Sequence, residues 1–190
     1  MNKKKIAVLV SGGGTNLQAL INAEKSGIVS SGEIVLVGSN NPKAFALERA
    51  KEAGIASFIF NEEKELLNRL KKEKIDLIVL AGYLRILSPE FIKEYPMRII
   101  NVHPALLPSF GGKGCYGIHV HEKALEYGVK VSGATVHFVN EVPDGGRIIS
   151  QKAVEVLEGD TPEVLQKRIM EEAEWIILPL AVEKVCKELC

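Results

Sequence analysis

One stretch decides the fold: Ile99-Ile100-Asn101-Val102-His103-Pro104-Ala105-Leu106-Leu107-Pro108. Its first residues are typical of a buried strand. Because side chains alternate between the two faces of a strand, Asn101 and His103 share one face while Ile100 and Val102 share the other. Pro104 has no amide proton to give to a sheet, so it ends the strand. The sequence therefore predicts an amide and an imidazole side by side at the carboxyl end of a strand.

This pair has the chemistry to act on a carbonyl group. In an open α/β sheet the carboxyl edge is where ligands bind, and an amide donor beside a titratable ring suits a carbonyl oxygen that becomes an oxyanion. Asp144 lies in a glycine-rich turn after a later strand. We expect its carboxylate to reach His103, raise the pKa of the ring and orient it. The alternative is that Asn101 caps a turn and His103 is a hydrogen-bonded core histidine.

Length, charge and cysteine content limit the class of protein. The 190 residues suffice for one well-buried core but are few for two domains, so we expect one domain. Lysine plus arginine and aspartate plus glutamate both number 24, so no net field attracts nucleic acid. No stretch approaches the ~20 apolar residues that cross a bilayer, and the three cysteines lack zinc or disulfide spacing. We expect a cytoplasmic protein with reduced thiols and with neither nucleic acid nor membrane as partner.

A glycine loop after the first strand predicts a phosphate site. Residues 5–10 form a short apolar strand, and Ser11-Gly12-Gly13-Gly14-Thr15-Asn16 leads into a helix. Backbone amides at a helix N-terminus favour an anion. A dinucleotide fingerprint is not met, because Leu17 stands where the third glycine belongs and no acidic residue follows the second strand at 33–37. The predicted ligand is a monophosphate. The alternative is that the loop binds no ligand and only caps the helix.

Alternating helices and short apolar strands predict an α/β fold with a doubly wound, mostly parallel sheet, extended by antiparallel strands in the C-terminal half. The strand at 147–154 is expected to be antiparallel to its neighbour because the connection is too short to cross over. Trp175 and a stripe on the last helix are assigned to the core, and His137 is assigned as a structural histidine. The stripe consists of Leu165, Ile169, Ala173 and Ile176. Further strands are expected at 56–60, 77–80 and 129–139, and helices at 41–52, 62–73, 120–127 and from 162, with a kink at Pro179.

Two loops have the composition of binding segments. Residues 81–89 combine aliphatic side chains with Arg85 at the carboxyl edge of a strand, which suits a flat heteroaromatic ligand. A buried connector is the alternative. Residues 108–117 are the most glycine-dense part of the chain, and we expect a mobile loop over the site or at its rim.

These motifs resemble those of the folate-dependent phosphoribosylglycinamide formyltransferases of purine synthesis. The similar stretches are residues 11–18, 80–89, 101–108 and 133–146, in the same order and spacing. The resemblance implies the formyltransferase fold and transfer of the formyl group of 10-formyltetrahydrofolate to the amine of glycinamide ribonucleotide, in de novo purine (IMP) synthesis, without a metal. We expect a single formyltransferase domain over residues 1–190, acting as a monomer or homodimer. Residues 1–100 would be the Rossmann-like, phosphate-binding half, and residues 101–190 the catalytic and folate-binding half.

The same resemblance assigns roles to residues. Catalysis falls to Asn101, His103 and Asp144, with protonated His103 and the Asn101 amide stabilising the developing oxyanion. The residues implied for the ribonucleotide are Gly14, Thr15, Asn16 and Glu174. Those implied for the folate are Leu84, Arg85, Ile86, Leu87, Asn101, Asn140, Glu141, Val142, Pro143 and Asp144. Lys64, with Arg69 as the alternative, is the basic residue implied for the folate tail. The loop at 109–117 is longer than in some members and leaves Cys115 and Tyr116 without a role.

Other functions use parts of the same pattern. A 10-formyltetrahydrofolate hydrolase would use the same three catalytic residues with water as acceptor, but its family carries an additional regulatory domain. Another folate-dependent formyltransferase, acting on a sugar nucleotide or an aminoacylated tRNA, would need a second domain, and the tRNA a basic face as well. A non-enzymatic nucleotide-binding module would explain the glycine loop but not the grouping of Asn101, His103 and Asp144.

Overall fold

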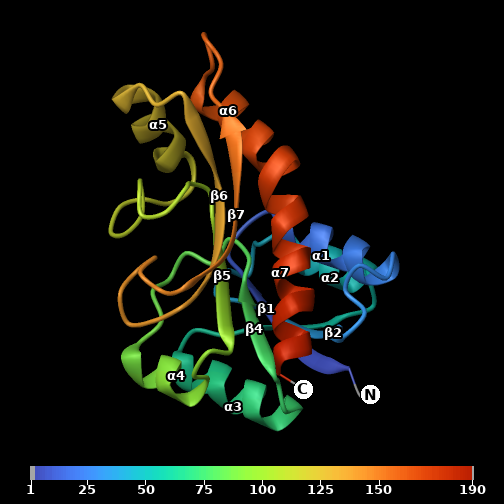
Figure 1. The fold of residues 1–190 in the computed structure, drawn as a ribbon. Helices are drawn as coiled ribbons and strands as arrows, with labels where there is room; N and C mark the ends of the chain where they lie inside the picture. Colours follow the sequence, from blue (N-terminus) through green and yellow to red (C-terminus); the bar gives the residue numbers. More distant parts are fainter. Residues whose placement is uncertain (1–2, 190) are drawn as a thin grey trace.

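The computed structural model describes residues 3–189 and shows one seven-stranded sheet with helices on both faces (Figure 1). The strands are β1 (Lys4–Val10), β2 (Gly32–Ser39), β3 (Ala56–Ile59), β4 (Leu77–Leu80), β5 (Ile99–His103), β6 (Val131–Phe138) and β7 (Ile148–Glu155). The helices are α1 (Thr15–Lys25), α2 (Ala46–Glu52), α3 (Glu63–Glu73), α4 (Pro89–Glu94), α5 (Ile118–Tyr127), α6 (Pro162–Ile169), the π-helix η1 (Met170–Glu174) and α7 (Trp175–Glu188).

The order of the strands is β3-β2-β1-β4-β5-β6-β7. The first five are parallel to one another, whereas β6 pairs antiparallel with both β5 and β7. This arrangement confirms the predicted α/β class and the antiparallel extension. It also places the carboxyl ends of β1, β4 and β5 at one edge of the sheet, where an open α/β fold binds its ligands.

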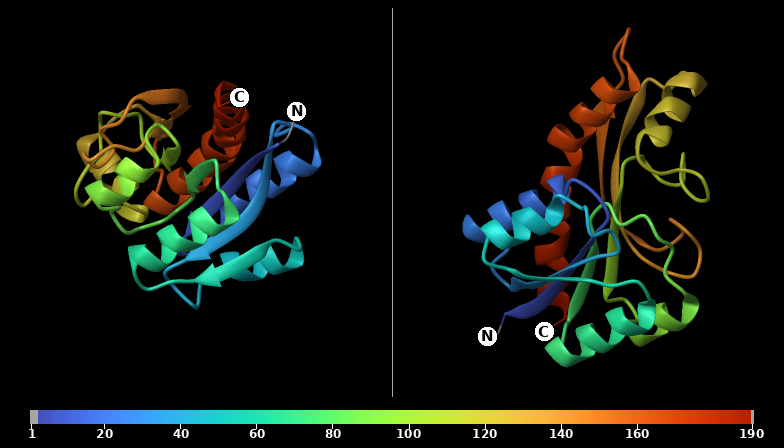
Figure 2. Two further views of the ribbon diagram at one scale, coloured as in Figure 1. Left: turned by 90° about the horizontal axis from the view of Figure 1, so that it is seen from below. Right: turned by 180° about the vertical axis from the view of Figure 1, so that it is seen from behind.

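Two apolar cores explain why the central strands are continuously apolar. Ile6, Val8 and Val10 of β1 face the core that α1, α2, α6 and α7 cover, while Ala7 and Leu9 face the core that α3 and α4 cover. The views in Figures 1 and 2 show α3 and α4 together on one side and α1, α2 and α7 on the other. A strand covered on both faces needs apolar residues at every position. No helix between residues 3 and 189 is long and apolar enough to span a bilayer.

The second helix begins later than predicted. The expected helix at 41–52 starts at Ala46, because the preceding residues form a turn. In that turn the Asn41 side chain accepts from the Lys43 amide, and the Ala46 amide donates to the Gly12 carbonyl. An asparagine that bonds to its own backbone competes with the first turn of a helix. The turn therefore packs against the glycine loop instead of extending α2.

The C-terminal helix also departs from the predicted pattern. Leu165, Ile169 and Ala173 are buried as expected, but Ile176 is 42% exposed and Ile177 takes its place in the core. The π-helix η1 widens one turn, so the buried stripe continues with a spacing of four residues rather than three. Trp175 is only half-buried. The helix continues through Pro179 to Glu188, and its irregular turn lies at residues 170–174.

Gly133 allows β6, the neighbour of β5, to pair with β7. A Cβ at this position would overlap the Lys152 carbonyl oxygen and lie 2.9 Å from Leu106 Cδ2. We predict that Gly133→Ala lowers the free energy of unfolding by at least ~2 kcal/mol, because a backbone atom must move. Urea denaturation measures the change. Gly13→Ala is the control, since a Cβ there has nothing within 4 Å, and an unchanged midpoint for Gly133→Ala would contradict the account.

Candidate active site

A cavity of about 460 Å³ lies at the carboxyl ends of the central strands. It contains residues from the glycine loop, the 81–89 loop, β5, the 140–144 turn and η1, which are far apart in the sequence. The predicted site residues that line it are Asn16, Leu84, Arg85, Ile86, Leu87, Asn101, His103, Asn140, Val142, Pro143, Asp144 and Glu174. The glycine-rich loop contributes Gly112 to Gly117, so the predicted place of this loop at the site is confirmed, while its mobility stays a prediction.

Four predicted site residues do not line this cavity. Gly14 lies at the N-terminus of α1 in a left-handed conformation, with φ of 71°, and Thr15 faces a second cavity. Glu141 forms an exposed ion pair with Lys93 at 3.8 Å. Lys64 is exposed on α3 and does not reach the cavity.

Arg69, the alternative to Lys64, does not line the cavity either. Arg69 pairs with Glu73 at 3.0 Å and stacks over the Phe58 ring. The basic residues that do line the cavity are Arg85 and Lys113. Arg85 and Lys113, rather than Lys64, are therefore the cations at hand for an acidic group on a ligand in this cavity.

His103 ends β5 and is held from several directions. The ring is 4% exposed, its Nε2 lies 2.9 Å from the Phe110 carbonyl oxygen, and its Nδ1 lies 3.6 Å from Asp144 Oδ2. The chain after His103 is fixed by Thr135, whose hydroxyl donates to the Ala105 carbonyl and accepts from the Leu107 amide. Both ring nitrogens therefore face oxygen acceptors, an arrangement that suits an imidazole when it carries two protons.

The pKa of His103 reflects a competition. Burial lowers the pKa most strongly, the Asp144 carboxylate and the Phe110 carbonyl raise it, and the charge of His137 lowers it. The net pKa is below the ordinary value for histidine. The prediction that Asp144 holds His103 protonated at pH 7 is therefore wrong for this structure. Asp144 acts in the predicted direction, but removal of the ring from water outweighs it.

Asp144 is positioned by a turn that only glycines permit. Its backbone is left-handed, with φ of 56°, and a Cβ at Gly146 would overlap the Phe138 carbonyl oxygen. Burial by itself would raise the pKa of the carboxyl. The neighbouring imidazoles of His137 and His103 and the Gly112 amide, which donates to Oδ2 at 2.8 Å, more than offset that, so the pKa is lowered. Asp144 is therefore a carboxylate at neutral pH.

His137 belongs to the same cluster, which the sequence did not indicate. Its ring is 2% exposed and lines the cavity, with Nε2 3.1 Å from Asn101 Nδ2 and 3.6 Å from Asp144 Oδ1. The antiparallel register places Asn101 directly opposite His137. Knowing that β5 and β6 pair in this register would have identified the residue, because directly opposed side chains lie on the same face of a sheet.

A second pair of polar side chains lies at the start of α1. The Asn16 amide donates to the Glu174 carboxyl from η1, and Glu174 is 6% exposed. Burial raises the pKa of Glu174, and the Asn16 bond only partly opposes this. The buried Asn16 Oδ1 has no hydrogen-bond partner among residues 3–189. A ligand with hydroxyl donors would satisfy these two groups.

Comparison with known proteins agrees with this geometry. The family model described as formyl transferase matches residues 4–182. The chain belongs to the formyl transferase family. A phosphoribosylglycinamide formyltransferase of Escherichia coli K12 is 41% identical, covering 93% of this chain and 84% of that protein. The chloroplastic phosphoribosylglycinamide formyltransferase of Arabidopsis thaliana is 42% identical over 98% of this chain.

The chain spans about two thirds of the length of that Arabidopsis protein, 66%. Among solved structures, glycinamide ribonucleotide transformylase 1 of Symbiobacterium toebii superposes with a TM-score of 0.90 at 40% identity, covering 98% of this chain and 89% of that one. The formyltransferase fold and the resemblance drawn from the sequence are thus confirmed.

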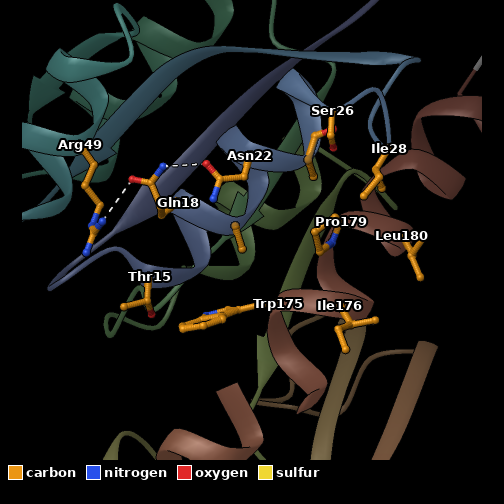
Figure 3. Close-up of a pocket in the computed structure, with 12 residues that line it drawn as sticks. Thr15, Gln18, Asn22, Ser26, Ile28, Arg49, Trp175, Ile176, Pro179 and Leu180 are labelled. Atoms are coloured by element: carbon orange, nitrogen blue, oxygen red, sulfur yellow. Dashed lines mark hydrogen bonds between the residues drawn. The ribbon is translucent and has the colours of Figure 1, made fainter. Parts of the chain in front are cut away.

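The chain has a second cavity, of about 560 Å³, between α1 and α7 (Figure 3). Its apolar wall comes from side chains such as Trp175, Ile176 and Leu180, and Arg49 and Gln18 form a hydrogen-bonded polar edge. The residues that line it include no histidine and no carboxylate. Because acid–base chemistry needs such groups, the smaller cavity with Asn101, His103 and Asp144 is the candidate active site. Within residues 3–189, no group of three or more His, Cys, Asp or Glu side chains is arranged to hold a metal ion, and the expectation of a metal-free reaction stays a prediction.

A buried histidine makes the stability of the chain depend on pH. His121 of α5 is fully buried, and neither ring nitrogen has a hydrogen-bond partner in the described chain. Burial, with a smaller contribution from the charge of His103, lowers the pKa of His121 to about 4. The unfolded chain therefore binds this proton at higher pH than the folded chain does. Stability is complete above the unfolded pKa of roughly 6.5 and declines as pH falls toward 4.

We predict that His121→Leu removes this part of the acid sensitivity, which amounts to about 3 kcal/mol at pH 4 for a shift of this size. Urea denaturation at pH 7.5, 5.5 and 4.5 measures it. His119→Leu on the same helix is the matched control, because His119 is exposed and pairs with Glu122. A His121→Leu variant that loses as much stability on acidification as the wild type would refute the prediction.

Proposed function

We propose that the chain transfers the formyl group of 10-formyltetrahydrofolate to the amine of glycinamide ribonucleotide. The observation that carries the proposal is the convergence of the Asn101 amide, the His103 imidazole and the Asp144 carboxylate in one cavity. The relatives named phosphoribosylglycinamide formyltransferase support the choice of acceptor. The donor supplies a formyl group on nitrogen, and the chain supplies binding, orientation and proton transfer.

The cavity suits two ligands that meet at the catalytic cluster. On one side, residues 84–87, Asn140 and residues 142–144 combine apolar walls with backbone groups, which fits a flat pterin ring. Beyond Asn16, outside the residues that line the cavity, the first-turn amides of α1 have no side-chain cap, which leaves them for a phosphate. Asn16 and Glu174 lie between, where ribose hydroxyls would satisfy their buried oxygens.

In the proposed reaction Asn101 donates an N–H to the formyl oxygen as negative charge develops there. The lowered pKa of His103 makes the ring a proton acceptor in the resting site. As the amine attacks, His103 takes its proton, and the adjacent Asp144 carboxylate stabilises the imidazolium that forms. The same proton then passes to the departing folate nitrogen. Binding holds the amine close to the formyl carbon, and this proximity lowers the activation barrier further.

The direct test mixes the purified chain with 10-formyltetrahydrofolate, with and without glycinamide ribonucleotide, and follows tetrahydrofolate formation. We expect turnover that requires the ribonucleotide and yields formylglycinamide ribonucleotide. Equal turnover without it would indicate a hydrolase instead. No turnover in either mixture, from a folded chain, would overturn the proposal.

The catalytic pair gives a second test. Asp144→Asn keeps the size of the side chain and removes its charge, so we predict a fall in kcat of at least about a hundredfold. His103→Ala should be as severe. Since the two residues act as a unit, the double variant should lose far less than the product of the two single losses. Steady-state kinetics decide this, and strictly multiplicative losses would contradict the coupling.

Glu174 tests the ribonucleotide side of the cavity. Glu174→Gln preserves an oxygen for the Asn16 amide but removes the carboxylate that would accept from hydroxyls. We predict at least a tenfold higher KM for the ribonucleotide and a KM for the folate within about threefold of the wild type, in the range for one charged hydrogen bond. Glu172→Gln, an exposed neighbour, is the control. Equal effects on both substrates would argue against this placement.

We further propose that residues 1–190 act as a single domain, because both halves share one sheet and every group invoked above comes from one chain. A monomer or homodimer and a cytoplasmic location stay predictions, which light scattering and cell fractionation would check.

A further inference from the structure

His137 has no part in the mechanism above, yet it contacts two of its three residues. The ring nitrogen Nε2 lies 3.1 Å from Asn101 Nδ2 and 3.6 Å from Asp144 Oδ1. The other nitrogen, Nδ1, lies 2.8 Å from the Phe138 carbonyl oxygen. The side chain is 2% exposed, so water does not compete for these positions.

The Phe138 carbonyl determines the tautomer of His137. A carbonyl oxygen only accepts, so Nδ1 carries the proton and donates it. A neutral ring has only one N–H, and Nε2 is left with a lone pair. Of the two side chains near Nε2, Asp144 Oδ1 at 3.6 Å is beyond hydrogen-bond distance and Asn101 at 3.1 Å is within it. The Asn101 group that faces Nε2 must then be a donor.

The tautomer in turn determines how the Asn101 amide is turned. Its NH2 group faces the Nε2 lone pair, because the opposite orientation would set the carbonyl oxygen of Asn101 against that lone pair. One N–H is used by His137. Among the described residues, no other group accepts from the Asn101 side chain, and Asn101 lines the cavity. The second N–H is therefore held available to a substrate oxygen.

We propose that His137 is a positioning residue, which locks the Asn101 amide in the orientation that presents an N–H donor to the oxygen that gains charge. Without the lock the amide can rotate by 180° and present its oxygen, an acceptor, to the same place. An oriented donor stabilises charge only as the charge develops, so the loss falls on kcat more than on either KM. The kinetic part of this inference rests on the proposed function.

Two substitutions separate the lock from the packing of the ring. His137→Gln offers an amide whose NH2 can donate to the Phe138 carbonyl while its oxygen replaces the Nε2 acceptor. His137→Asn is shorter and retains only the group near the Phe138 carbonyl. We expect kcat of His137→Gln within about threefold of the wild type and kcat of His137→Asn at least tenfold lower, with every KM within about threefold. Equal kcat for the two folded variants would overturn the proposal.

A spectroscopic measurement tests the lock without any activity. In the wild-type chain labelled with ¹⁵N-histidine at pH 7.5, we expect His137 Nδ1 to give the signal of a protonated ring nitrogen and Nε2 that of an unprotonated one. Loss of these signals in His137→Gln assigns them. A protonated Nε2 would overturn the proposal even if formyl transfer is found, whereas the expected tautomer supports the lock even if a folded wild-type chain transfers no formyl group. The failure of the proposed function and the failure of this inference are thus distinguishable.

Discussion

The protonation of the buried His103 imidazole depends on one charged neighbour, the Asp144 carboxylate. Burial opposes a charge on the ring, and the carboxylate at 3.6 Å favours it, so the proton affinity of the site is a balance of two opposing effects. In this structure burial prevails. In the proposed reaction a proton comes to the ring against that burial, and Asp144 is the group that favours its uptake. The glycines around Asp144 and the loop that donates from Gly112 serve to hold this carboxylate in place.

The sheet supplies the geometry that this balance requires. Because β5 is parallel to β4 but antiparallel to β6, the strand that ends in His103 lies beside a strand that leads directly into the Asp144 turn. The two groups proposed for catalysis thus meet although residues 104–130, which include the glycine-rich loop and α5, separate the two strands along the chain. The glycine-rich loop then covers the cluster, with the Phe110 carbonyl on His103 and the Gly112 amide on Asp144.

Patterns in the sequence predicted those features that depend only on residues close together along the chain. Alternation along β5 placed Asn101 and His103 together, and Thr161 with Pro162 predicted the start of α6. The role of His137 was missed because it depends on the register between two strands, which no spacing along the chain reveals. The exposed Ile176 follows from a π-helix that leaves no clear mark in the sequence. The lowered pKa of His103 depends on how deeply the ring is buried, a property of the whole fold.

The most direct test of the account is the pKa of His103, measured by NMR titration of the wild type and of Asp144→Asn. If burial lowers this pKa and the carboxylate opposes the lowering, the wild-type value lies below the ordinary 6.5 for histidine and falls further when the charge of Asp144 is removed. A pKa that is unchanged or higher in Asp144→Asn would contradict the claim that Asp144 controls the proton on His103.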